Sequence, residues 1–426
     1  MFTYEKTYYF PDSLSRAKGD LTRPVSPIHA RDVENIAITG PGTLDGQGIG
    51  WWPMQEKWWS NHKQYHSDAF YEEVWRDINR NVDYDKDLEN YMDDQSNYGD
   101  NRPVAVRPSM LKPINCKNIL LEGFTIKNSP MWTINPVMCE NIIIRRLTIR
   151  AETGYDNPHT PNTDGINPES SKNVLIEYCN IITGDDSFAV KSGLDEAGRK
   201  RGIPSENIVI RHCTNRRISI GSEMSGGIRN VYVHDCNVIG GMNRAIHIKT
   251  VRGRGGVVEN LWFENIHFDT VKENAIFVNM FYGDREEEQV TERTPQFRNF
   301  HFNNISGKMS ERPVAVMGIP EMPAENIFFK DIDIKGFKGL LLMNCGNVQF
   351  NNTVLDIMKG PMISVFDGWD MEFNELQLEN EPSTFMEVSG SRSGNILFPK
   401  ELFEMKRLVV YGPDAELGSV EFSMID

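Results

Sequence analysis

The most constraining feature of this 426-residue sequence is a short motif, an Asn followed by continuous or alternating apolar residues, that recurs along the chain. Successive copies are 141 − 118 = 23, 230 − 207 = 23 and 347 − 326 = 21 residues apart where the spacing is tight, and 299 − 260 = 39 apart where a loop intervenes. Such internal periodicity is typical of a solenoid. The copies begin at Asn35, Asn118, Asn141, Asn173, Asn207, Asn230, Asn260, Asn299, Asn326 and Asn347.

The coil length and the short β-branched runs favour a parallel β-helix over a helical repeat. Each short strand cannot bury its inner face alone, so neighbouring coils must stack, and an Asn at the strand entry can adopt the turn conformation and stack on the next Asn. A β-sandwich would need hairpin turns such as Asn-Gly, which are nearly absent. We therefore predict an all-β, single-stranded right-handed parallel β-helix, with residues 1–426 as one domain.

One segment interrupts the repeat. Residues from about 51 to 102 are rich in Trp, Tyr, Asp and Glu, with helical spacing around Phe70–Trp75. We expect a lateral, partly helical insertion, which could line a binding site or merely seal its own aromatic residues against the β-helix.

The six cysteines follow the same rhythm, since three lie two residues before a repeat Asn and three lie six residues after one. This regularity favours small apolar residues stacked inside the coils over a disulfide framework. They are Cys116, Cys139, Cys179, Cys213, Cys236 and Cys345.

Charge and hydropathy exclude several classes of partner. The formal charge of −15 argues against nucleic acid, although a local basic cluster could still bind a polyanionic sugar. No stretch has the apolar length of a membrane-spanning helix. The charged start, MFTYEKTYYF, lacks the apolar run of a signal peptide, so we expect either a cytoplasmic protein or one whose periplasmic or secretion signal was removed.

Two acidic motifs lie one coil apart. The motif Asn162–Gly165 contains Asp164, the motif Gly184–Ser187 contains Asp185 and Asp186, and 185 − 164 = 21 residues. Stacked coils would bring the three carboxylates together, where like charges raise each other's pKa. A protonated carboxyl beside an ionised one is what a glycosidase needs.

These aspartates have two alternative interpretations. Asp next to Gly often satisfies a tight turn, but two such motifs one coil apart favour catalysis. Clustered carboxylates can also bind calcium, as in β-helix lyases. We expect neither a metal nor another cofactor.

The sequence resembles glycoside hydrolase family 28, the polygalacturonase family, from about residue 30 to residue 350. The resemblance implies an inverting hydrolase in which Asp185 is the general acid, while Asp164 and Asp186 hold and activate water. It also implies that Lys249 binds the substrate carboxylate and that Tyr282 lines a subsite. The matching segments are Asn162–Gly165, Gly184–Gly193, Ile220–Asn230 and Ile248–Thr250.

Further substrate contacts are expected from Asn162, His247, Glu223 and Arg217. Segment 220–227, Ile-Gly-Ser-Glu-Met-Ser-Gly-Gly, resembles bacterial and often exo-acting members, so Glu223 could lie near the non-reducing end of the substrate or serve only a structural role at a strand end. A basic cluster around Lys249 supports an anionic sugar. It consists of Arg244, Arg252 and Arg254.

The sequence departs from the family pattern twice. The Gly-His-Gly element before Ile-Gly-Ser is missing, with Arg216 and Arg217 nearby, and His247 replaces the Arg of the family's Arg-Ile-Lys element. We therefore expect a specificity shifted towards a modified, branched or unsaturated pectic oligosaccharide. A weakly active enzyme, a non-catalytic pectin-binding relic and a β-helix lyase are the alternatives. The first coil begins almost at once, so residues 1–30 or a second subunit in a homo-oligomer would cap it.

Overall fold

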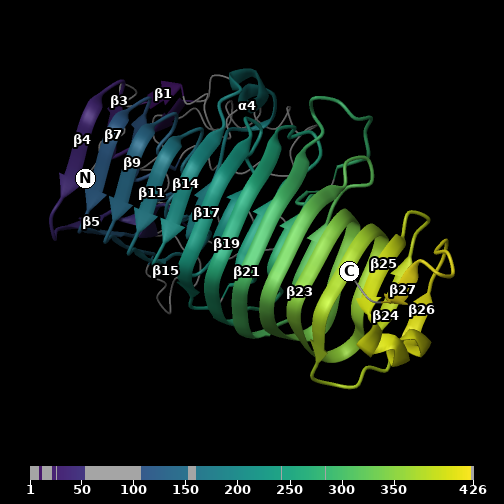
Figure 1. Ribbon diagram of the computed structural model, residues 1–426. Coiled ribbons are helices and arrows are strands. Elements are labelled where there is room, and N and C mark those ends of the chain that lie inside the picture. Colours follow the sequence, from purple (N-terminus) through teal and green to yellow (C-terminus); the bar gives the residue numbers. More distant parts are fainter. Residues whose placement is uncertain are drawn as a thin grey trace, which may run out of the picture.

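The computed structural model describes residues 9–11, 22–24, 26–52, 107–151, 160–240, 242–283 and 285–423. Parallel strands stack along one axis, from β4 at the amino end of the stack to β25 and β27 near the carboxyl end (Figure 1). Because parallel crossovers are right-handed, this is the right-handed parallel β-helix predicted from the repeat.

The strands fall into three parallel ladders. The first, which we call the Asn sheet, pairs successive copies of the repeat motif. Its strands are β4 (Glu34–Thr39), β7 (Lys117–Glu122), β9 (Glu140–Arg145), β11 (Lys172–Glu177), β14 (Ser205–Arg211), β17 (Ile228–Val238), β19 (Val257–Thr270), β21 (Gln296–Ser310), β23 (Ala324–Leu378), β25 (Gly394–Pro399) and β27 (Val420–Ser423).

The second ladder consists of shorter strands, and the longer strands β17, β19 and β21 continue into it round the bend of the coil. Its separate strands are β5 (Thr43–Asp45), β8 (Thr125–Lys127), β10 (Thr148–Arg150), β12 (Asn180–Ile182) and β15 (Thr214–Asn215).

The third ladder, which we call the site sheet, carries the residues of the candidate site. Single bridges through Ile134 and Ile166 join its first strands to the rest. Its strands are β3 (Ile28–Arg31), β6 (Leu111–Ile114), β13 (Phe188–Val190), β16 (Ile218–Gly221), β18 (Ile246–Lys249), β20 (Asn274–Asn279), β22 (Arg312–Met317), part of β23, β24 (Met386–Ser389) and β26 (Val409–Tyr411).

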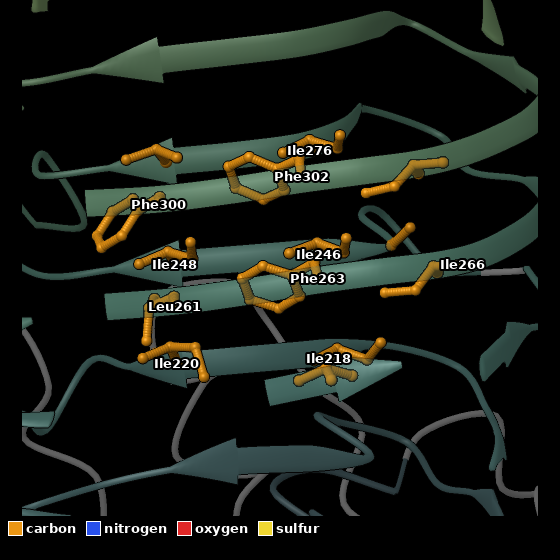
Figure 2. Packing of buried hydrophobic residues seen from close by; sticks show 14 of the residues in the cluster. Ile218, Ile220, Ile246, Ile248, Leu261, Phe263, Ile266, Ile276, Phe300 and Phe302 are labelled. Atoms are coloured by element: carbon orange, nitrogen blue, oxygen red, sulfur yellow. The ribbon is translucent and has the colours of Figure 1, made fainter. Parts of the chain in front are cut away.

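Equivalent inward residues of successive coils stack to form one continuous core. Figure 2 shows Ile218, Ile246 and Ile276 above one another on the site sheet, facing Phe263 and Phe302 from the Asn sheet. Towards the carboxyl end the aromatic stack continues, with ring centroids 4.4 to 5.3 Å apart. This burial removes apolar area that no single coil could cover, which is why the coils need one another.

The repeat Asn residues form the expected ladder. Each has a positive φ, between 49° and 62°, which Asn tolerates better than most residues. From Asn118 onward, each amide also donates to the Asn of the preceding coil, for example Asn207 Nδ2 to Asn173 Oδ1 at 3.2 Å. The prediction of stacked amides at the strand entry is therefore confirmed.

All six cysteines are buried and free, as predicted. The helices that lie wholly within the described residues are short: α4 (Asp195–Arg201) and the 3-10 segments η2 (Gly48–Gly50) and η5 (Lys400–Leu408). The strands β1 (Tyr9–Pro11) and β2 (Thr22–Pro24) form a separate antiparallel pair. Among the described residues, no helix is long and apolar enough to cross a membrane.

The predicted insertion at 51–102 lies outside the described residues except for its first two. Trp51 and Trp52 are buried, and Trp52 Nε1 donates to Ser129 O at 3.0 Å. Much of the proposed cap, residues 1–30, also lies outside the described residues. The assignment of 1–426 to one domain stays a prediction.

Candidate active site

The three aspartates lie on neighbouring coils of the site sheet. Asp185 and Asp186 directly precede β13, and Gly165 N, next to Asp164, donates to Asp186 O at 2.9 Å. A Cβ on Gly165 would lie 2.5 Å from Ser187 O, so only Gly allows the two acidic motifs to stack this closely. The 21-residue spacing in the sequence is therefore one coil in the structure.

Asp186 is the most strongly paired of the three carboxylates. It accepts hydrogen bonds from Lys249 Nζ at 2.8 Å, from Ser219 Oγ at 2.6 Å and from Arg217 Nε. Burial alone would raise the pKa of Asp186, but the charges of Arg217 and Lys249 outweigh burial and lower that pKa below its usual range. Asp186 is therefore ionised at neutral pH.

Asp185 is the most exposed of the three, with 29% of its side chain accessible. Arg217 Nη2 lies 2.5 Å from Asp185 Oδ1, and the amide of Asn162 donates to Asp185 Oδ2 at 3.5 Å. Asn162 is itself held by the buried Arg107, whose Nη2 donates to Asn162 Oδ1 at 2.8 Å. Asp185 is thus the carboxyl that a ligand entering from solvent would meet first.

Asp164 is buried and its surroundings favour the neutral acid. Its closest donor is the neutral amide of Asn167, at 2.8 Å, while Lys191 Nζ is 3.9 Å away. Burial, followed by the negative charge of Asp185, raises the pKa of Asp164 to about 7. One protonated and one ionised carboxyl therefore lie side by side, which is the asymmetry that acid–base catalysis requires.

Three of the residues expected to bind substrate come together beside Asp186. Lys249 Nζ lies 5.0 Å from the centre of the Tyr282 ring, and the His247 ring is 5.6 Å from the same ring. His247 also stacks on Phe277 at 5.3 Å. Burial and the charges of Lys249 and Arg244 hold the pKa of His247 well below its usual value, so this imidazole is neutral.

Arg217 and Glu223 are placed differently from the other expected contacts. The Arg217 guanidinium bonds to both Asp185 and Asp186, so its donors face the carboxylates. Glu223 is 1% exposed and accepts a hydrogen bond from Lys191 Nζ at 2.8 Å. Its burial against Lys191 supports the structural role at a strand end, and a contact with the end of the substrate stays a prediction.

The sequence did not single out Lys191, Ser219 and Arg107, although each contacts a residue of the site. For two of them, the alternation of side chains along a strand was an available signal. Ser219 is paired with His247 in the register of the site sheet. Lys191 lies two residues after Ala189, which is paired with Ser219. Arg107 had no signal, since it lies far from every motif in the sequence.

The basic cluster expected around Lys249 is largely paired within the protein. Arg252 bonds to Glu321, Arg254 to Asp195, and Arg244 to Glu273. In the ranges that the structure describes, no group of three or more His, Cys, Asp and Glu side chains could hold a metal ion.

Comparison with known proteins places these features in context. The family model described as "Glycosyl hydrolases family 28" matches residues 85–355. A "Probable polygalacturonase" of Vitis vinifera is 30% identical over 319 residues, which are 73% of this chain and 55% of that protein. An "Endo-polygalacturonase" of Pectobacterium parmentieri is 28% identical over 286 residues, 66% of this chain and 58% of that protein. The chain thus spans little more than half the length of these relatives.

Among solved structures, an exopolygalacturonase from Thermotoga maritima superposes with a TM-score of 0.60. It is 31% identical in sequence, and the alignment covers 87% of this chain and 75% of that one.

Proposed function

Because this chain belongs to glycosyl hydrolases family 28, we propose that it hydrolyses galacturonic-acid-containing pectic oligo- or polysaccharides with inversion, cutting from chain ends. One observation carries the proposal: Asp164, Asp185 and Asp186 stack on adjacent coils with unequal protonation, next to the buried cation of Lys249.

The reaction needs one proton donor and one activated water. We assign the donor role to Asp185, the exposed carboxyl, which would protonate the leaving glycosidic oxygen as the bond to the anomeric carbon breaks. Water held by Asp164 and Asp186 would attack that carbon from the opposite face and pass its proton to Asp164. Burial and the charge of Asp185 favour a proton on Asp164 in the resting site, and this proton would move to Asp185 before the bond breaks, which leaves Asp164 ionised to accept the proton of the water.

Substrate recognition would fall to the residues beside Asp186. The Lys249 ammonium is the cation that could bind the sugar carboxylate, with Tyr282 forming one wall of the subsite. His247 stands where the family pattern has an arginine, and a neutral ring there cannot make a bidentate contact with a carboxylate. This difference supports a specificity shifted from ordinary polygalacturonan towards a modified, branched or unsaturated pectic oligosaccharide.

Cutting from chain ends is supported by the likeness to the exopolygalacturonase from Thermotoga maritima. The alternatives are a pectin-binding protein without catalysis and a β-helix lyase. Incubation with digests of homogalacturonan, rhamnogalacturonan and xylogalacturonan separates all three. Hydrolysis yields new reducing ends without the ultraviolet absorbance of an unsaturated product; a lyase yields both signals. Binding without either signal would contradict the proposal.

A further inference from the structure

A buried ion pair lies next to Asp164 and takes no part in the proposed reaction. Lys191 Nζ is 2.8 Å from Glu223 Oε2, and the two side chains are only 3% and 2% accessible. The same ammonium lies 4.6 Å from the centre of the Trp132 ring. Lys191 follows β13 and Glu223 follows β16, so the pair joins two neighbouring coils.

The pair contacts the candidate site through Asp164. Lys191 Nζ is 3.9 Å from Asp164 Oδ2, which is 1.1 Å farther than from Glu223 (3.9 − 2.8). Removing charges from water is expensive, so a buried ammonium binds its closest carboxylate strongly. Glu223 is therefore the main partner of the ammonium, and Asp164 interacts with it only at the longer distance.

The other cationic side chains near Asp164 pair with other groups. Lys249 and Arg217 pair with Asp186, and Arg217 also pairs with Asp185. Three further arginines near the site bond to other groups: Arg107 to Asn162 and two backbone carbonyls, Arg201 to Glu169, and Arg244 to Glu273. Beside burial and the charge of Asp185, the charge of Asp164 therefore depends on its distance from Lys191.

We propose that Lys191 and Glu223 are a positioning pair for Asp164: Glu223 holds the lysine ammonium at its own carboxylate, and Asp164 keeps its proton. The inference deepens the proposed function, on which its catalytic meaning rests. Neither residue touches the reacting atoms. Their effect is that the buried site keeps one carboxyl proton at near-neutral pH, the condition under which the carboxylates can divide acid and base roles.

Two variants should move the titration of Asp164 in opposite directions. In Glu223→Gln, Lys191 loses its partner and turns to Asp164, which favours the ionised carboxylate. In the double variant Lys191→Met/Glu223→Gln, Asp164 has neither the lysine nor the competing glutamate, and its neutral form is favoured at least as much as in the wild type. The double variant leaves no unpaired charge of the pair buried, so it should fold even if the single variant does not.

The direct test is an infrared titration of the full chain without substrate, following the carbonyl band of protonated carboxyl groups. A band that persists near neutral pH and is lost in Asp164→Asn is assigned to Asp164. Its midpoint should fall by about one to three pH units in Glu223→Gln, as expected for a cation brought into contact. In the double variant it should stay at or above the wild-type midpoint.

An exposed ion pair provides the control. Lys338 Nζ lies 2.6 Å from Glu311 Oε1, with 45% and 39% of the side chains accessible. Glu311→Gln and Lys338→Met/Glu311→Gln should leave the band unchanged. An unchanged or raised midpoint in Glu223→Gln, or no such band in the wild type, would overturn the inference.

The pH profile of kcat on trigalacturonate then links the pair to catalysis. Its alkaline limb should move with the infrared midpoint, whereas a purely structural role would lower the active fraction without moving the limb. If the infrared shifts occur but the wild type turns over no pectic substrate, the proposed function fails while the assignment of the pair stands.

Discussion

Lys249 Nζ donates to Asp186 Oδ2 at 2.8 Å, and both side chains are more than nine-tenths buried. The ammonium that we expect to bind the substrate carboxylate therefore also neutralises a carboxylate to which we assign a catalytic role. Binding of an anionic sugar must share this cation with Asp186, which links recognition of the substrate to the charge of the site.

Lys249→Met should therefore affect both affinity and stability. The loss of one partner from a buried pair costs about 3 kcal/mol in the free energy of unfolding. We expect kcat/KM on trigalacturonate to fall by about a hundredfold, since a desolvated charge contact is worth about 2–5 kcal/mol. Chemical denaturation and steady-state kinetics measure the two effects, with the exposed Lys338→Met as control. Unchanged kinetics would remove Lys249 from the site.

The raised pKa of Asp164 should make the stability of the fold depend on pH. Between the unfolded pKa of about 4 and the folded value of about 7, the native state keeps a proton that the unfolded chain has lost. This group therefore destabilises the fold as pH rises through that window, by about 1.4 kcal/mol per pH unit.

Asp164→Asn removes this pH-dependent loss of stability, so the variant should gain stability over the wild type between pH 5 and pH 7, by up to about 3 kcal/mol. The lowered pKa of Asp186 acts in the opposite direction and below this window, because its contribution is lost only as pH falls below about 4. Urea denaturation at both pH values measures the difference. Parallel pH dependence in the two proteins would show that Asp164 titrates normally.

His247 should recognise substrate as a neutral ring. Its Nε2 is buried and has no hydrogen-bond partner among the described residues. His247→Phe keeps the stack on Phe277 but removes this nitrogen, so KM for the preferred oligosaccharide should rise about tenfold, the worth of one hydrogen bond. His301→Phe, in a stack on the Asn sheet, is the matched control. An equal KM in both variants would exclude the contact.

The Asn ladder can be tested at a position far from catalysis. Asn207 has a φ of 56° and bonds to the amides of Asn173 and Asn230. Asn207→Gly loses the amide but fits the left-handed backbone, whereas Asn207→Ala loses both. Thermal or urea unfolding should show Ala to be less stable than Gly by about 1 kcal/mol. Equal losses would assign the role of Asn to its hydrogen bonds alone.

Much of the fold could be predicted because the repeat reports it directly. A coil must bring equivalent residues into register, so the spacing of Asn141 from Asn118 and of Asp185 from Asp164 gave both the ladder and the cluster of carboxylates. The free cysteines followed for the same reason.

The electrostatic partners could not be predicted in this way. Lys191 and Glu223 are 32 residues apart, and whether they meet depends on how far each strand end extends past the sheet. The direction of Arg217 depends on the turn before β16, and this arginine bonds to two of the carboxylates. The repeat predicts which backbone segments lie on neighbouring coils, but it does not predict which charged side chains pair.

We propose that this carboxylate cluster hydrolyses a pectic chain with Asp185 as the acid. The most direct test compares the release of reducing ends from galacturonate oligomers by the wild type and by Asp185→Asn, with unfolding measured in parallel. We predict that the variant folds with nearly unchanged stability and loses activity by about a hundred- to ten-thousandfold. Wild-type turnover by a folded Asp185→Asn would contradict the assignment of Asp185 as the acid.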